Sequence, residues 1–149
     1  MTYVDAVRGR RRLFHPGLVA MGAILLIAVF ATDFVYWRTL LFQWNNFSSW
    51  LLMAGLIFAA LAAIAFVVDL ATHRLAGVAW LRFLGLAVAA LLSVLNALVH
   101  SRDAYTAVVP EGIVLSAVVA ALLIAVGFGG WTLEAARTRP ATRTWDARR

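Results

Sequence analysis

Four long runs of apolar residues, separated by short polar segments, dominate the chain. The runs cover about residues 18–37, 50–70, 76–99 and 113–133. A helix of roughly 20 apolar residues crosses a hydrocarbon core of about 30 Å, and it satisfies its backbone hydrogen bonds within one segment, as lipid requires. The pattern therefore predicts an all-α integral membrane protein, folded as a compact four-transmembrane-helix bundle in a single domain, 1–149.

The composition supports this class. Hydrophobic residues make up 64% of the chain and charged residues only 13%. A soluble domain of this size could not bury so much apolar surface. The chain has no cysteine, which excludes disulfides, thiolate chemistry and cysteine-ligated zinc or iron–sulfur sites.

The first apolar run has a second interpretation, as a secretory signal peptide. The basic segment RGRRR precedes the run, and VFA stands before Thr32 like a cleavage site. The apolar run nevertheless continues through residues 34–37 and ends at the aromatic Trp37. This continuation favours a retained span.

Arginine supplies all 13 basic residues, and its distribution predicts the orientation of the spans. Most arginines lie in the tails 1–13 and 135–149 or beside the middle loop, whereas the other two loops hold only Arg38 and Arg102. By the positive-inside rule, both tails and the middle loop are cytoplasmic.

The net charge of +6 suits basic segments beside anionic headgroups, so membrane lipids are expected partners. No nucleic-acid recognition motif is present, and nucleic acid is not an expected partner.

Small residues recur at four-residue spacing in three of the spans. Such ladders allow helix backbones to approach closely, and van der Waals packing then replaces the hydrophobic drive that lipid removes. The ladders therefore favour a compact bundle, and they could also pack against helices of another protein. Their members are Gly55, Ala59 and Ala63; Gly85, Ala89, Ser93 and Ala97; and Ala117, Ala121, Ala125 and Gly129.

Asp33 is a carboxylate near the outer end of the first span. It lies one turn before Trp37, which places it roughly 6 Å below the interface. On the third span, Ser93, Asn96 and His100 share one helical stripe that reaches the same depth. We expect an outer polar cluster of these four residues, in which Asp33 bonds Asn96 or His100. An ion path would need polar residues through the middle of the bundle, where the sequence offers none.

A second polar cluster is expected at the inner face, where Asp69 closes the second span. The favoured contact is a salt bridge from Arg82 to Asp69 or Glu134. The full set is His15, Asp69, His73, Arg74, Arg82 and Glu134.

The positions of the two aspartates argue against an enzyme. Asp33 and Asp69 lie at opposite membrane faces, so they cannot work as a catalytic acid–base pair. No nucleophile–base arrangement, phosphate-binding loop or metal-ligand spacing is visible either. We predict no catalytic residues and no metal site.

The segment HPGL at residues 15–18 has two interpretations. Pro16 suits the first turn of a helix, where its missing N–H costs nothing. Alternatively, His15 could be an axial haem ligand, with His73 or His100 opposite. All three histidines lie at span ends, however, whereas a bis-histidine haem usually needs both ligands well inside a bundle.

Four short motifs are similar to a known family. They are His15-Pro16 opening the first span, Asp33 near its end, Asp69 closing the second span, and Gly129-Gly130 with Glu134 ending the fourth. Together they resemble the bacterial four-span membrane domain-of-unknown-function family two-two-three-one, over about residues 13–137. The resemblance implies a multi-pass protein of the bacterial inner membrane. Because family members occur beside or fused to Rieske and cytochrome c modules, it also implies an association with membrane electron transfer.

The chain departs from the family pattern at two places. Many members have a histidine and an asparagine four apart early in the third span, where this chain has Arg82 and Leu86. Many also carry a histidine just after the glutamate that closes the fourth span, where this chain reads EAARTR. If those histidines hold a cofactor in relatives, this chain has lost it.

Two functional hypotheses follow. The first is a non-catalytic accessory or scaffold subunit of a membrane complex, redox or photosynthetic, whose partners are other membrane protein subunits and which holds no cofactor. The second is a membrane electron-transfer protein that binds haem b.

Overall fold

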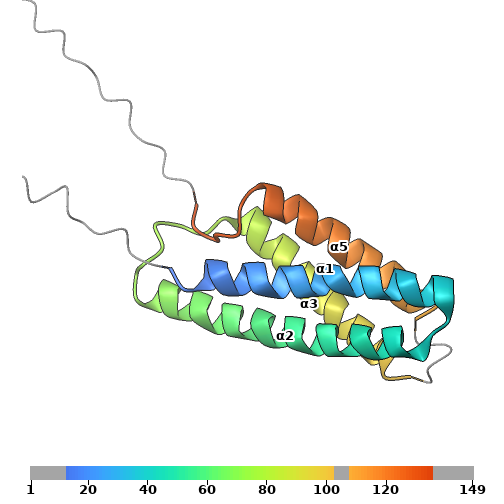
Figure 1. Cartoon of the computed structure of the whole chain (residues 1–149). Coiled ribbons are helices and arrows are strands. Elements are labelled where there is room, and N and C mark those ends of the chain that lie inside the picture. The colour runs from blue at the N-terminus through green and yellow to red at the C-terminus, as the bar shows by residue number, and fades with distance from the viewer. Residues whose placement is uncertain (1–12, 103–107, 136–149) are drawn as a thin grey trace, which may run out of the picture.

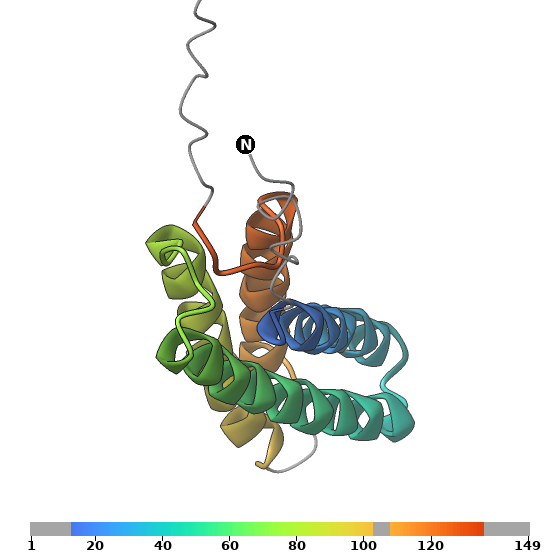
Figure 2. The same ribbon diagram turned by 90° about the vertical axis from the view of Figure 1, so that its left-hand side faces the viewer.

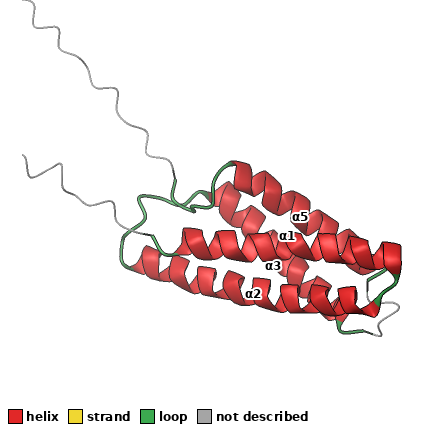
Figure 3. Cartoon of the chain, in the orientation of Figure 1, coloured by secondary structure: helices red, strands yellow, loops and turns green. Residues whose placement is uncertain are grey.

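A computed structural model describes residues 13–102 and 108–135 and shows a bundle of long helices (Figure 1). The helices are α1 (His15–Thr39), α2 (Phe42–Ala71), α3 (Trp80–His100) and α5 (Glu111–Phe128). Each of the four is long and apolar enough to cross a membrane. In these described ranges the only β-structure is one isolated bridge (Figure 3). The predicted all-α, four-span class is confirmed.

α1 begins and α5 ends at the same end of the bundle (Figure 1), which we call the terminal end; the opposite end is the far end. α1 packs along α2 and against α5, while α3 packs mainly against α5 and less against α2. Figure 2 views this arrangement from the terminal end. The first and last described segments thus lie on one side, as an even number of spans requires.

The predicted helix starts are correct for α1 and wrong for α2. Pro16 lies in the first turn of α1, as the HPGL segment indicated. α2 begins at Phe42 rather than near residue 50. The hydropathy pattern predicts a loop for its polar first turns, but Asn45 and Ser48 are buried there and face the other helices. These polar side chains therefore belong to a buried polar site between the helices and not to a loop.

The predicted end of the fourth span is also wrong, because α5 stops at Phe128 rather than near residue 133. Gly129 and Gly130 follow, and Gly130 has a φ of +88°, a conformation that glycine adopts without a Cβ clash. The chain then turns back along the segment before α3. Backbone bonds link Ala79 N–H to the Leu133 carbonyl (2.8 Å) and Ala135 N–H to the Gly77 carbonyl (3.0 Å).

The bundle has one apolar core to which all four helices contribute. Its buried side chains separate the two ends of the bundle, and several of them line an apolar cavity of about 400 Å³ between the helices. Larger apolar side chains such as Ile24, Ile64 and Leu91 are exposed on the outside, as expected of surfaces that face lipid. The core residues are Ala23, Leu26, Val29, Leu52, Ala89, Val119 and Leu123.

Two of the three small-residue ladders lie at helix contacts within the bundle. A Cβ added to Gly55 would come within 2.7 Å of Leu26 on α1, and one added to Gly85 within 2.7 Å of Val126 on α5. The third ladder, on α5, differs. Its members Ala121 and Ala125 are exposed on the outer surface, whereas a Cβ at its last member, Gly129, would lie 3.0 Å from Arg82 Nε on α3.

Candidate functional site

A buried pair of His15 and Asp69 closes the terminal end of the bundle. His15 is the first residue of α1, Asp69 lies one turn from the end of α2, and both are completely buried. The His15 Nδ1 atom is 2.9 Å from Asp69 Oδ2. The backbone N–H of Phe14 donates to the same oxygen at 3.1 Å. The start of α1 is therefore fastened to the end of α2.

The second ring nitrogen of His15 fixes its protonation state. The backbone N–H of Leu133 donates to His15 Nε2 at 3.0 Å, so Nε2 is an acceptor and carries no proton. Nδ1 must then carry the proton that is donated to Asp69. His15 is a neutral imidazole facing an ionised carboxylate, and it joins α1, α2 and the segment after α5.

The other predicted inner residues surround this pair without the expected salt bridge. Arg74 NH1 lies 3.7 Å from Asp69 Oδ1, and its guanidinium lies over the Phe14 ring at 4.8 Å. Arg82 instead donates to the Thr132 carbonyl at 3.2 Å.

The expectation that Arg82 pairs with Asp69 or Glu134 is therefore corrected. Glu134 Oε1 accepts from the backbone N–H of Ala76 at 3.3 Å. The α5 end turns back earlier than predicted, which places a backbone carbonyl within reach of Arg82. His73 lies exposed in the turn after α2, with a φ of 51°.

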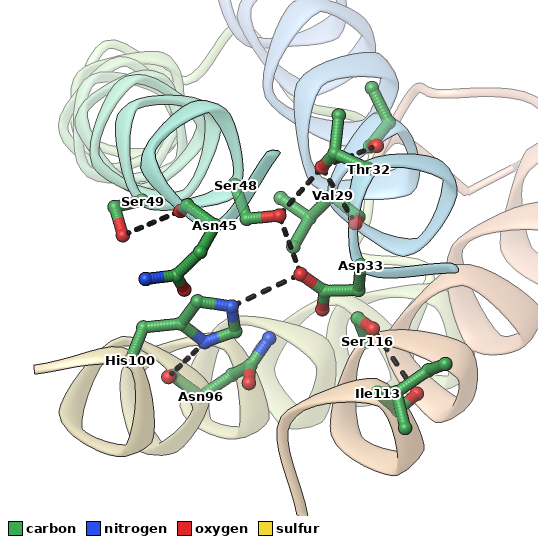
Figure 4. A network of polar contacts seen from close by, with 11 residues as sticks. Val29, Thr32, Asp33, Asn45, Ser48, Ser49, Asn96, His100, Ile113 and Ser116 are labelled. Carbon is green, nitrogen blue, oxygen red and sulfur yellow. Dashed lines mark hydrogen bonds and ion pairs between the residues drawn. The ribbon is translucent and has the colours of Figure 1, made fainter. Parts of the chain in front are cut away.

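A second buried pair, Asp33 and His100, lies at the far end (Figure 4). Asp33 Oδ1 accepts from the Ser48 hydroxyl at 2.5 Å and is 3.1 Å from His100 Nε2. The Ser48 oxygen is also 2.7 Å from the Thr32 hydroxyl. Ser48 on α2 and His100 on α3 both contact the same oxygen of Asp33 on α1, so this one carboxylate oxygen joins three helices.

The two other predicted members of the outer cluster do not bind Asp33 with their side chains. Ser93 donates to the Ala89 carbonyl of its own helix at 2.8 Å. Asn96 contributes its backbone carbonyl, which lies 3.0 Å from His100 Nδ1. Ser48 is the partner of Asp33 that the sequence pattern did not predict. The pattern placed the first turns of α2, where Ser48 lies, in a loop.

The hydrogen bonds of His15 and His100 occupy the ring nitrogens that haem iron would need. An axial ligand offers the lone pair of a ring nitrogen to iron. Both ring nitrogens of His15 are hydrogen-bonded, and both nitrogens of His100 face oxygens within 3.1 Å. The two rings also lie at opposite ends of the bundle. Haem ligation by either would break an interhelical tie.

We expect Asp33→Asn to be tolerated and Asp33→Leu to be destabilising. Asparagine keeps an acceptor for Ser48 and His100, whereas leucine removes the acceptor that both side chains contact. One interhelical hydrogen bond in a membrane protein averages about 0.6 kcal/mol, so losing two should cost more than about 1 kcal/mol. Thermal unfolding in detergent measures the difference. Equal melting temperatures for the two variants would show that Asp33 is not a tie between helices.

The chain was compared with known proteins. A family model described as "Predicted membrane protein (DUF2231)" matches residues 12–138. No curated protein and no solved structure matches the chain.

Proposed function

We propose that this chain, which belongs to the DUF2231 family of predicted membrane proteins, is a non-catalytic accessory or scaffold subunit of a larger membrane complex. One observation carries the proposal. The two buried aspartates and two buried histidines of the described residues form two pairs, and each pair ties three segments together. Groups that a membrane enzyme would direct at a substrate are here directed at neighbouring helices.

The separation of the two pairs supports a non-catalytic role. Asp33 and Asp69 lie at opposite ends, and the core between them consists of apolar side chains. No acid–base pair can therefore assemble across the bundle. Within the described ranges, no group of three or more histidine, aspartate or glutamate side chains could hold a metal ion.

The outer surface of α5 supports an association with other subunits. Two members of its small-residue ladder, Ala121 and Ala125, are exposed on the surface of the described bundle. Small residues on a helix surface allow another transmembrane helix to approach closely. We take the partner to be a component of a membrane electron-transfer complex, as the family resemblance implies, in the bacterial inner membrane.

Purification of the tagged protein from its native membrane in mild detergent, followed by mass spectrometry, tests this function. We expect membrane protein subunits to accompany the wild-type chain in fixed proportion. Ala121→Leu should release them, whereas Ala60→Leu, a matched change at an exposed alanine of α2, should not. Recovery of the wild-type chain without partners would contradict the proposal.

The proposed orientation has both tails in the cytoplasm. A reporter fused after Arg149 should therefore be active in the cytoplasm, and one inserted between Leu40 and Leu41 in the periplasm. This insertion site replaces the predicted loop at residues 43–47, which is helical. Activity of both reporters in the same compartment would exclude the four-span arrangement.

A further inference from the structure

The far-end site contains buried hydrogen-bond acceptors that have no partner. Three buried side-chain oxygens there have no hydrogen-bond partner among the described residues: Asp33 Oδ2, Asn45 Oδ1 and Asn96 Oδ1. Figure 4 shows the two amides beside the His100 ring and the free carboxylate oxygen of Asp33 turned toward Ser116. Buried acceptors of this kind favour the binding of a group that brings a hydrogen.

The neighbouring hydroxyl groups cannot supply that hydrogen. The hydroxyl groups of Ser93 and Ser116 donate to backbone carbonyls of their own helices. Only Ser48 donates to Asp33 without ambiguity. The remaining contact of Asp33, with His100 Nε2, depends on where a proton lies.

The hydrogen bonds of His100 require that proton. Nδ1 faces the Asn96 carbonyl, which can only accept, so Nδ1 carries a hydrogen. Nε2 faces Asp33 Oδ1 at 3.1 Å. If neither atom carried a proton, two lone pairs would oppose each other. One additional proton, on the imidazole or on the carboxyl group, converts this repulsion into a hydrogen bond.

The pair at the terminal end differs, although it contains the same residue types. There the Leu133 N–H occupies His15 Nε2, so His15 with one proton hydrogen-bonds both Asp69 Oδ2 and Leu133. Asp69 Oδ1 has no hydrogen-bond partner, but the Arg74 guanidinium lies 3.7 Å from it. An added proton would oppose the backbone N–H. Only the far-end pair therefore requires an extra proton.

We propose that Asp33 and His100 form a proton-binding site that takes up one proton from the aqueous phase at the far end of the bundle. His100 is the last residue of α3 and is followed by the exposed residues Ser101 and Arg102, so the aqueous phase lies one turn away. Uptake forms one N–H or O–H bond, breaks none within the protein, and needs no co-reactant.

The site has no polar path along which a proton could continue to the terminal end. Apolar core residues, including Leu26, Leu52 and Leu123, lie between it and the terminal end. Bound protons thus return to the side from which they came. The site senses pH at one membrane face and does not conduct.

Among the described residues at this end, the other charged groups that pair with each other are exposed, whereas Asp33 and His100 are buried. On α1, Tyr36 is buried and packs with Val108. Arg102, after α3, and Glu111, on α5, form an exposed ion pair at 2.9 Å. The residues that α2 directs at the pair, Asn45 and Ser48, do not titrate. Within the described part of the chain, the buried pair whose contacts depend on a proton at this end is therefore Asp33 and His100.

Loss of the proton should loosen the far end. The protonated form has the interhelical bond and the deprotonated form has two opposed acceptors, so the stability due to this site is present at low pH and lost as pH rises through its titration. The end of α3 would then separate from α1 and α2.

Nitrogen NMR of the histidine-labelled protein in lipid nanodiscs tests the proposal, with resonances assigned through His→Gln variants. We expect His100 signals to move in one titration step, whereas His15 keeps one protonated nitrogen over the same range. The His100 step should disappear in Asp33→Asn and persist in Glu111→Gln. A His100 signal that does not move, or that moves equally in Asp33→Asn, would overturn the proposal.

Two further measurements separate proton binding from loss of fold and from conduction. The melting temperature of the wild type should fall as pH rises, and that of His100→Gln, which keeps a donor toward Asp33, should not follow this slope. Liposomes containing the wild type should show no proton leak above empty liposomes. Equal slopes of melting temperature against pH in the wild type and His100→Gln would overturn the proposed proton-binding site. A proton leak that Asp33→Asn abolishes would overturn the claim that the site does not conduct.

Discussion

Asp69→Ala is expected to destabilise the protein far more than Glu111→Ala. Asp69 is completely buried and accepts from His15 and from the Phe14 N–H. Its removal leaves the buried His15 Nδ1–H and the partly buried Phe14 N–H without an acceptor, and a buried donor without a partner costs about 1–3 kcal/mol. The Glu111 side chain is 58% exposed, so water can hydrogen-bond Arg102 in the Glu111→Ala variant. Thermal unfolding in detergent compares the two, and equal effects would mean that Asp69 is not held by buried partners.

A variant at the histidine shows whether the two residues act as a pair. His15→Leu leaves the buried Asp69 carboxylate without the hydrogen bond from His15 Nδ1, and a buried group that loses its hydrogen-bond partner costs about 1–3 kcal/mol. The double variant His15→Leu/Asp69→Leu removes the stranded charge. It should therefore be more stable than His15→Leu alone. A double variant with the summed loss of both single variants would show that the residues are independent.

Gly22→Leu should separate α1 from α2. A Cβ at Gly22 would lie 3.3 Å from the Gly55 carbonyl oxygen and 3.4 Å from the Ala59 nitrogen. These are backbone atoms, which cannot rotate away as a side chain can. We expect a loss of about 1–3 kcal/mol, the usual range for overpacking.

Gly17→Leu is the matched control on the same helix. A Cβ at Gly17 would meet nothing within 4 Å, so this variant should unfold close to the wild type. If the two leucine variants unfold alike, close contact at Gly22 does not limit stability.

The helices could be predicted from the sequence because lipid imposes a long apolar run on each. Their ends could not all be predicted. Asn45 and Ser48 resemble loop residues in a hydropathy pattern, although they are buried at the start of α2. At the other end, the run through Trp131 continues the apolar pattern, but the backbone turns back after Phe128.

The sequence indicated the residues of the two sites better than their contacts. Depth along the spans placed Asp33 level with His100, and the structure joins them at 3.1 Å. The sequence pattern could not show that the Leu133 N–H donates to His15, because this hydrogen bond uses a backbone group from a segment predicted to be helical. Backbone N–H and C=O groups are the same for nearly every residue type, so their hydrogen bonds cannot be predicted from a residue pattern.

The visible absorption spectrum tests most directly the central claim that the buried histidines tie helices together and hold no redox group. The protein would be expressed with a haem precursor in excess and purified in mild detergent. We expect no Soret band, either before or after reduction with dithionite. A Soret band that shifts on reduction and disappears in His15→Gln or His100→Gln would contradict the claim.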